Sequence, residues 1–443
     1  MEKRVMVNEL PAKVGEEVVL GGWMHRFRNL GKVAFVVLRD RTGLVQCVLD
    51  DTLIDTVKDL QVESVLRITG KVVESPKKDS VEIQVTKIKV ESAVTDMIPV
   101  EINKEEVDAH METIIDHRPV TLRHEKQKAI FAVQAGILNA FRNAMVRRGF
   151  TEFRTPALMG APSESGASVF EVKYYQDKAY LAQSPQVYKQ IMVGVFERVF
   201  TIAPVFRAEK HNTSRHIMEL TQLDGEMGFI DSYDEALQVV EGVVRDILGY
   251  LAEHHSEELA LWSVELPRLP EGAFPRIKVR EALELIEKST GKPAQREELD
   301  LDPDDEREIA AWAREEHASD FLWLLNFKKD KNFYTWNDTE QPEESLSFDL
   351  ECRGLEWLSG THRIHDYEVL LERMKDQGLT LDTYAHYLEA FKYGIPSEAG
   401  FSLGLERMTM QILELKNIRE ATLFPSDLDR IAGQRISEMR DKE

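Results

Sequence analysis

The sequence predicts an α+β protein in two parts, a small β-barrel followed by a larger body built on an antiparallel sheet flanked by helices. Three observations support this fold class. The first hundred residues contain short runs of β-branched and apolar residues separated by turn signals. A long stretch of helical periodicity follows, and strand-like runs return in the second half of the chain. Because the sequence has no GxxxxGK[ST] or GxGxxG loop, nothing in it favours a parallel nucleotide-binding sheet.

Length and composition indicate a soluble enzyme of two or three domains. The chain has 443 residues, of which 43% are hydrophobic and 30% are charged. No apolar run approaches the roughly 18 residues of a membrane span, and the N-terminal segment lacks the apolar core of a signal peptide. Cys47 and Cys352 lie far apart, without metal-ligand spacing. We therefore expect a cytoplasmic protein with no membrane partner, structural zinc or disulfide.

Charge is distributed unevenly along the chain. The net charge is −22, yet residues 1–100 contain 15 basic and 15 acidic residues, so the whole deficit falls in residues 101–443. A neutral front part can still bind RNA through local patches. Nonspecific binding of nucleic acid by the whole chain should be weak.

The first part, residues 1–100, is predicted to be a small Greek-key barrel of the OB type. One helical segment is expected near residues 51–60. Such barrels bind single-stranded nucleic acid by stacking bases on exposed aromatic rings beside basic side chains. Phe35 is a candidate for such a ring, although a phenylalanine in a strand is more often a core residue. The strands are expected at residues 17–27, 32–40, 44–50, 64–73 and 80–90.

A hinge and a long helix are predicted next. Residues 101–123 are charged, and we interpret them as a hinge that contains a short helix. From Glu125 to Arg148 apolar residues recur at helical spacing, and an extended segment that contains Pro156 follows. An apolar helix face that stays exposed needs a partner.

The body, residues 124–443, is organised around a hairpin. The runs VFTIAPVFRAE and MELTQLDGEMGFI are predicted to be two strands joined by a polar turn that contains Asn212, Thr213 and Ser214. Their charged residues alternate with apolar neighbours, so one face of the hairpin must be charged. A solvated salt-bridge ladder is the ordinary explanation of such a face, and a polar binding site is the alternative. The charged residues are Arg207, Glu209, Glu219, Asp224 and Glu226.

Helices and further strands follow the hairpin. Residues 232–330 alternate amphipathic helices with loops and carry much of the acid excess, which we interpret as solvated surface. Strand signals then return and complete the antiparallel sheet. The runs that carry them are DFLWLLNF, FYTW, SLSFDLECRGLEWLSG and GFSLGLERMTMQIL.

Several motifs resemble those of the class II aminoacyl-tRNA synthetases. FRAE followed by RHxxE and DxE is similar to motif 2, the helix from Glu125 with Pro156 is similar to motif 1, and GFSLGLERM is similar to motif 3. The longer run from QSPQVYKQ to GEMGF resembles the aspartyl-tRNA synthetases of the archaeal type, and the likeness extends from the first strand to about Phe424. This resemblance implies an OB-fold anticodon-binding domain, a class II catalytic domain and a homodimer formed through motif 1. It also implies an aspartate–tRNA ligase, which uses ATP to make aspartyl-adenylate and transfers aspartate to tRNA(Asp).

The resemblance also implies which residues bind ATP. Arg207 matches the motif 2 arginine that holds the α-phosphate, and Arg407 matches the motif 3 arginine on the γ-phosphate, so both are expected to be catalytic. Arginine suits this role because its planar fork makes bidentate contacts. Asp349 and Glu356, which we expect on one strand, match a pair of Mg²⁺-binding acids, and Mg²⁺ prefers carboxylate and phosphate oxygens. The expected ATP set is Arg207, Glu209 on the adenine amino group, Arg215, His216, Leu220, Asp349, Glu356 and Arg407.

The aspartate and tRNA sites follow from the same resemblance. Lys189 and Arg363 match the two cations that neutralise the side-chain carboxylate of aspartate, since a buried carboxylate needs paired charge. Asparaginyl enzymes differ at the position of Lys189, which favours aspartate as the substrate. Glu164, Gln186 and Asp224 are expected to contact the α-amino group and its surroundings. The residues expected to read the anticodon are Arg26, Arg28, Phe35, Gln46 and Glu82.

The sequence departs from the family pattern at several positions. Leu220 stands where an aromatic ring usually stacks on adenine, so ATP should be held less firmly. Thr361 and His362 replace a small residue and an amide residue before the motif arginine, which should reshape the aspartate pocket. Ala399 replaces a glycine before motif 3, and Ser426 replaces an arginine in FPSD.

Two other functions stay open. One is a paralogue that activates aspartate or a related amino acid outside translation, and the other is an inactive paralogue that binds RNA. Intact Arg207, Asp349, Glu356 and Arg407 argue against inactivity. Charging of tRNA(Asn) is also open, because His25 resembles enzymes that charge both tRNAs, whereas the SPKKDS turn has lysine where some of those enzymes have proline.

Overall fold

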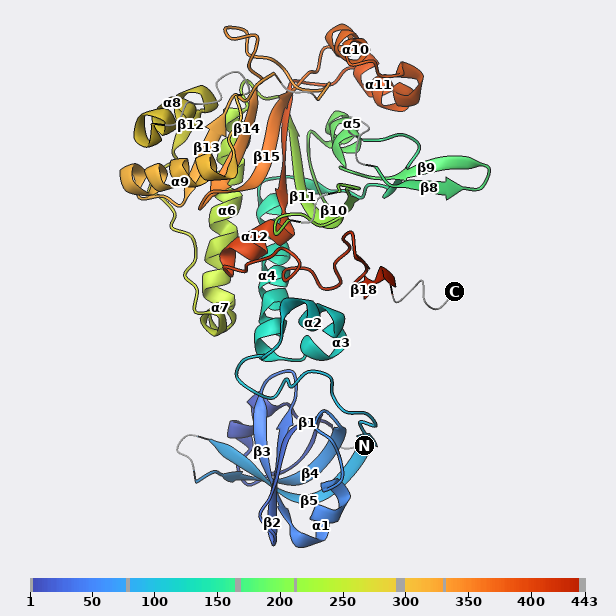
Figure 1. Ribbon diagram of the computed structural model, residues 1–443, viewed down its shortest axis with the longest axis vertical. Coiled ribbons are helices and arrows are strands. Elements are labelled where there is room, and N and C mark those ends of the chain that lie inside the picture. The colour runs from blue at the N-terminus through green and yellow to red at the C-terminus, as the bar shows by residue number, and fades with distance from the viewer. Residues whose placement is uncertain are drawn as a thin grey trace. The chain divides into compact units, whose positions relative to one another are not determined.

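The chain forms two compact units, Met1–His110 and Met111–Glu443. Figure 1 shows the computed structural model. The expected hinge, residues 101–123, is divided between the two units. The residues that the structure describes are 3–76, 80–163, 169–210, 213–291, 299–329 and 332–437.

The first unit is a closed five-stranded barrel, which confirms the predicted architecture. The strands follow the order β1-β2-β3-β5-β4, in which β3 and β5 are parallel and the other paired neighbours are antiparallel. Within β2, Ala34, Val36 and Leu38 are fully buried because alternate side chains point into the barrel, whereas Phe35 is only half-buried. Phe35 is therefore not a core residue. The elements are η1 (Val7–Lys13), β1 (Glu17–Asn29), β2 (Val33–Arg39), β3 (Leu44–Asp50), α1 (Asp51–Val57), β4 (Val65–Glu74) and β5 (Val81–Ser92).

The second unit begins with helices. Two short helices, α2 (Met111–Asp116) and α3 (Arg118–Thr121), occupy the region where one was expected. The long predicted helix is α4 (Glu125–Arg147), which packs against α6 (Asp234–His254) and α7 (Ser256–Trp262). By length and composition α4 could cross a membrane, but half of its most apolar window is buried inside this unit, as in the core helix of a globular protein.

An eight-stranded sheet forms the centre of the second unit (Figure 1). Its six inner strands are antiparallel, as predicted, but the strand at each edge pairs in parallel with its neighbour. One of these edge strands lies within the expected helical insertion at residues 232–330, so that segment also builds the sheet. In order across the sheet the strands are β12 (Arg276–Lys278), β13 (Phe321–Leu325), β14 (Ser347–Cys352), β15 (Leu355–Arg363), β16 (Glu398–Gly404), β11 (Glu219–Gly228), β10 (Arg198–Phe206) and β6 (Thr151–Glu152).

The two faces of this sheet have different surroundings. One face packs on α4, α6 and α12 (Leu405–Ile412), where Phe141, Val244 and Met408 lie in one fully buried apolar cluster with residues of the strands. The other face carries the polar residues of the inner strands. Apolar burial on the first face anchors the sheet and fixes which side chains of each strand point the opposite way.

The remaining elements surround the sheet. The run FYTW was predicted to be a strand, which is wrong: it forms only an isolated bridge from Thr335 to Arg363. A separate apolar cluster packs the helix at residues 186–196 against the helices at residues 367–376 and 385–392. The elements are β7 (Leu158–Met159), β8 (Glu171–Tyr174), β9 (Asp177–Leu181), α5 (Gln186–Phe196), α8 (Val279–Thr290), α9 (Pro303–His317), α10 (Tyr367–Asp376), η2 (Leu381–Tyr384), α11 (Ala385–Lys392), β17 (Arg430–Ile431) and β18 (Gln434–Arg435).

Candidate active site

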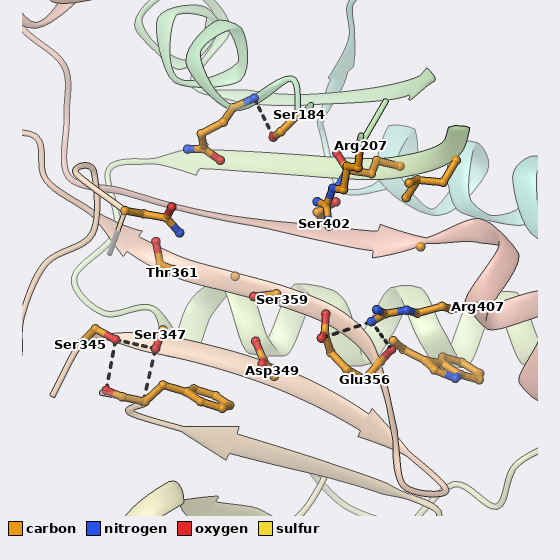
Figure 2. Close-up of a pocket in the computed structure, with 18 of the residues that line it drawn as sticks. Ser184, Arg207, Ser345, Ser347, Asp349, Glu356, Ser359, Thr361, Ser402 and Arg407 are labelled. Carbon is orange, nitrogen blue, oxygen red and sulfur yellow. Dashed lines mark hydrogen bonds and ion pairs between the residues drawn. The ribbon is translucent and has the colours of Figure 1, made fainter. Parts of the chain in front are cut away.

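A polar pocket of about 590 Å³ lies over the polar face of the sheet (Figure 2). Side chains from β11, β14, β15 and β16 line it, together with residues of α5 and α12. In Figure 2, Ser359 and Thr361 of β15 and Ser402 of β16 project from the two central strands. The pocket is therefore built by segments that are far apart in the sequence and come together only in the folded sheet.

The predicted hairpin forms one wall of this pocket. Strands β10 and β11 pair antiparallel over nine residue pairs, which confirms the hairpin. In β11, Leu223 and Met227 enter the apolar core, so Gln222, Asp224 and Glu226 point to the other face. The charged face is thus a buried site rather than a solvated ladder, because Asp224 and Glu226 have no exposed surface.

The placement of the other hairpin charges corrects the prediction. Strand β10 ends at Phe206, so Arg207 and Glu209 lie beyond the strand in the long connection to β11. Glu219 opens β11 and is exposed. Of the predicted turn, Asn212 lies outside the described residues.

Two buried cations meet two buried acids at one end of the pocket. The Nζ atom of Lys189 lies 3.0 Å from Asp224 Oδ2 and 3.2 Å from Glu226 Oε2. Arg363 Nε donates to Glu226 Oε1 at 2.7 Å, and Nη2 donates to Glu226 Oε2 at 3.3 Å. Lys189 and Arg363 are only 2% and 3% exposed, yet both line the pocket. The carboxylate of Glu226 therefore holds both cations at the pocket wall.

This cluster is balanced in charge. Two cations face two acids, and Ser402 donates a hydrogen bond to Asp224 at 2.6 Å. Burial lowers the pKa of Arg363, but the charge and hydrogen bonds of Glu226 outweigh burial and raise that pKa above its ordinary value. Because the cations are already paired, the protein can keep them buried before any ligand arrives.

Two further arginines lie at the other end of the pocket. Arg207 Nε is buried and has no hydrogen-bond partner, and within the described residues no ion pair forms to its guanidinium. Arg407 Nη1 lies 3.2 Å from Glu356 Oε2, and Figure 2 shows these two side chains pointing toward each other. The charge of Glu356 raises the pKa of Arg407 above its ordinary value. The unpaired fork of Arg207 and the pocket position of Arg407 suit the binding of an anionic group between them.

Acidic side chains gather beside Arg407. Asp349 and Glu356 both line the pocket, and they lie on neighbouring strands of a tight hairpin, not on one strand as predicted. Burial raises the pKa of Glu351 well above its ordinary value, and the nearby charges of Glu306, Glu356 and Asp349 raise it further. Among the described residues no three His, Cys, Asp or Glu side chains converge as a complete metal site. A cation that keeps phosphate and water ligands, as Mg²⁺ does, needs only one or two carboxylates from the protein.

Comparison with known families shows which family this chain belongs to. A family model described as tRNA synthetases class II (D, K and N) matches residues 110–428. The chain belongs to the class II aminoacyl-tRNA synthetases. A second model, described as an OB-fold nucleic acid binding domain, matches residues 18–91, which confirms the OB type of the barrel.

The relatives of this synthetase align along nearly its whole length. An aspartate--tRNA(Asp/Asn) ligase of Aeropyrum pernix is 40% identical over 94% of this chain and 96% of its own. One from Thermus thermophilus is 41% identical over 97% of this chain and 99% of its own. Among solved structures, asparaginyl-tRNA synthetase from Pyrococcus horikoshii, complexed with asparaginyl-adenylate, has a TM-score of 0.89 at 30% identity, covering 97% and 100% of the two chains.

The residues expected to bind ATP in this synthetase come together around the pocket. Synthetases of this class use ATP as a substrate. Arg215 pairs with Glu306 of α9 at 2.8 Å, a contact that the sequence did not suggest. His216 Nδ1 lies 2.6 Å from Thr213 Oγ1. The full set that lines the pocket is Arg207, Glu209, Arg215, His216, Leu220, Asp349, Glu356 and Arg407.

Only some of the residues expected to bind aspartate line the pocket. Gln186, Lys189 and Arg363 line the pocket. Asp224 is fully buried beneath Lys189, so it supports the cation and does not line the pocket. Glu164 lies outside the described residues.

The departures from the family pattern have different structural effects. Thr361 lines the pocket and accepts a hydrogen bond from Arg363, so it holds that cation. His362 points to the opposite face of β15, where Ser397 contacts its Nε2 at 3.1 Å, and burial lowers its pKa to about 4. Ala399 belongs to the apolar core. Ser426 Oγ accepts a hydrogen bond from Ala432 N at 3.1 Å.

The residues expected to read an anticodon lie mostly on one outer face of the barrel. Arg28 is the register partner of Phe35, and Gln46 is the partner of Glu82, with a side-chain hydrogen bond of 2.9 Å. The side chain of Arg26 donates through Nε to the Asn103 carbonyl at 3.1 Å, so it also ties the segment after the barrel. His25, which bears on the choice of tRNA, is 9% exposed.

Several functional residues escaped the sequence prediction. Glu226 was noted as a charge but was given no role, and Gln190, Glu351 and Glu398 were not noted. Each has another polar residue within two positions in the sequence, so no isolated polar residue in an apolar run identified it. Their roles depend on contacts between strands, which the sequence does not display.

Proposed function

We propose that the protein is a cytoplasmic aspartate–tRNA ligase that activates aspartate with ATP and transfers it to tRNA(Asp). The observation that carries this proposal is the pair of buried cations, Lys189 and Arg363, in the wall of a pocket that Arg207 and Arg407 also line. A small amino acid with a side-chain carboxylate matches the first pair. The phosphates of ATP match the second.

The first step is attack of the aspartate α-carboxylate on the α-phosphorus of ATP, which releases pyrophosphate. Negative charge builds on the phosphoryl oxygens, so positioning and fixed positive charge supply the catalysis. Arg207 holds the α-phosphate with its free guanidinium, and Arg407, oriented by Glu356, holds the departing end. Mg²⁺, held by Asp349 and Glu356, would neutralise further phosphate charge.

Recognition of aspartate rests on charge as well as shape. A substrate carboxylate placed against Lys189 and Arg363 is attracted by both charges and can accept hydrogen bonds from both side chains, whereas a neutral amide is attracted less strongly. This favours aspartate over asparagine. Gln186 and Glu164 are the residues that we propose contact the α-amino group.

The barrel and α4 supply the remaining parts of the function. Phe35, Arg28 and the Gln46–Glu82 pair offer one ring beside polar and basic groups, which suits stacking of anticodon bases. A homodimer through motif 1 would cover Val146, which is 57% exposed near the end of α4. The names of the Aeropyrum and Thermus relatives include both tRNA(Asp) and tRNA(Asn), so tRNA(Asn) belongs in the test.

One experiment separates this function from its alternatives. Aspartate-dependent ATP–pyrophosphate exchange should occur without tRNA, and tRNA(Asp) should then be charged. Exchange without charging of either tRNA would identify an amino-acid-activating paralogue. Loss of both, with retained binding of tRNA, would identify an inactive RNA-binding protein.

A further inference from the structure

A buried glutamate lies directly behind the amino-acid end of the pocket. Glu398 is the first residue of β16 and has no exposed surface. Its Oε1 accepts a hydrogen bond from Gln190 Nε2 at 2.8 Å. Its Oε2 is buried and finds no hydrogen-bond partner anywhere in the described part of the chain. A carboxylate in this setting would have one hydrogen-bond donor for two charged oxygens.

The side chain of Glu398 is a neighbour of the Glu226 carboxylate. Glu398 and Gly400 are two residues apart on β16, so they share one face of the strand. The Glu226 carboxylate lies over Gly400, where a Cβ atom would overlap it. Glu226 already forms ion pairs with both neighbouring cations, Lys189 and Arg363.

The two cations near Glu398, Lys189 and Arg363, are already paired with other acids. Lys189 and Gln190 face it from α5, Glu226 from β11, Arg363 from β15 and Tyr387 from α11. An ionised Glu398 would be a third acid among two bases already balanced by Asp224 and Glu226. A buried charge without its own partner is strongly disfavoured relative to the neutral form.

We propose that Glu398 is a neutral carboxylic acid and that it positions Gln186, Lys189 and Arg363 to accept an amino acid with an anionic side chain. Two routes connect it to the pocket. Gln190 donates to Glu398 and accepts from Gln186 at 2.9 Å and from Tyr387 at 3.0 Å, so its amide orientation is set by three contacts. The second route runs through Glu226. Because a neutral Glu398 does not compete for the two cations, the Glu226 carboxylate keeps its ion pairs with Lys189 and Arg363.

The electrostatics of the site support the neutral form. Burial raises the pKa of Glu398 well above its ordinary value, and the charge of Glu226 raises it further, against smaller opposing effects of Gln190, Arg363 and Lys189. Ionisation would instead place a negative charge beside the position of the substrate carboxylate, and aspartate would be repelled.

The test compares Glu398→Gln with the wild type. A glutamine keeps the acceptor for Gln190 and replaces the acid proton with an amide donor, so it mimics the neutral acid. Glu398→Gln should retain kcat and the KM for aspartate within about threefold at neutral pH, while Glu398→Ala should raise that KM at least tenfold. A tenfold loss in Glu398→Gln would overturn the proposal, because it would show that the charge is required.

A second measurement needs no substrate. A raised pKa in the folded state means that the folded protein binds a proton which the unfolded chain has lost, so this stabilisation is complete at low pH and decreases as pH rises. From the ordinary carboxyl pKa up to the raised pKa of the folded state, the unfolding equilibrium constant of the wild type should therefore increase with pH relative to Glu398→Gln, by at most about tenfold per pH unit for one proton. A ratio that does not change with pH would refute the neutral acid.

A control variant and the substrate-free measurement distinguish failure of the Glu398 proposal from failure of the proposed function. Glu241→Gln changes a buried acid of α6 that accepts from Trp323 Nε1 at 3.1 Å, away from the pocket, so it should leave the KM for aspartate unchanged. The positioning role of Glu398 rests on the proposed function. If the wild type showed no aspartate-dependent exchange, the proposed function would fail, but the unfolding measurements would still decide the protonation of Glu398.

Discussion

Replacing Lys189 with methionine tests the charge balance of the amino-acid pocket most directly. The Nζ atom of Lys189 contacts Asp224 at 3.0 Å and Glu226 at 3.2 Å, and it donates to the Phe401 carbonyl at 3.3 Å. All of these groups are buried. Lys189→Met keeps most of the side-chain volume and removes the charge, which leaves Asp224 without a cation while Glu226 retains Arg363.

The size of the effect follows from this geometry. Removal of one partner from a buried ion pair costs about 3–5 kcal/mol, because the remaining charge is left uncompensated. We expect a loss of that size in the free energy of unfolding, measured with urea. Aspartate-dependent pyrophosphate exchange should decrease at least about a hundredfold, since about 3 kcal/mol corresponds to two factors of ten.

A second substitution separates the two effects. Asp224→Asn in the Lys189→Met background removes the uncompensated acid, and the new side chain can still accept from Ser402. It should restore roughly 1–3 kcal/mol of stability but no exchange activity. Lys178→Met, at an exposed lysine paired with Glu171, is the matched control and should change neither property. If Lys189→Met kept exchange within tenfold of the wild type, the assignment of this pocket to the aspartate carboxylate would be wrong.

Three further substitutions test other parts of the site. Leu220→Phe should lower the KM for ATP up to about tenfold, because a ring at this position adds ~1 kcal/mol of stacking on adenine. The KM for aspartate should not change. A higher KM for ATP would show that Leu220 does not contact the adenine. Phe35→Ala should weaken tRNA charging by roughly 1–3 kcal/mol per lost stacked base and leave tRNA-free exchange intact, whereas equal damage to both activities would make Phe35 structural. Gly400→Ala should displace the Glu226 carboxylate and lose about 1–3 kcal/mol of stability, as seen by urea unfolding, together with a higher KM for aspartate. An unchanged KM there would mean that Glu226 does not hold the cations in place.

Local patterns in the sequence determined the elements of the fold. Alternation of buried and polar residues identified the strands of the barrel and the β10–β11 hairpin, because side chains of a strand point to opposite faces in turn. Helical spacing identified α4 to within one residue at its end. Motif resemblance then selected the residues that the folded chain brings to one pocket, including Arg207, Asp349 and Arg407.

Turn geometry was harder to predict. Asp349 and Glu356 looked like two acids of one strand, but Arg353 and Gly354 both adopt positive φ angles, 52° and 75°, and turn the chain back between β14 and β15. Such two-residue hairpin turns require positive φ at both positions, and arginine is not a residue that signals one. The turn places the two carboxylates on adjacent strands, facing the same pocket.

Only the tertiary structure decided how the charges of the pocket are paired. Arg363 and Glu226 are 137 residues apart, and Glu398 reaches Gln190 across 208 positions. Nothing local in the sequence indicates that Glu226 holds two cations, that Asp224 lies beneath Lys189, or that one oxygen of Glu398 has no donor. The reason is physical. Strand and helix patterns arise from each segment's own burial, whereas the energy of a buried charge depends on which other segments the fold brings within a few ångströms of it.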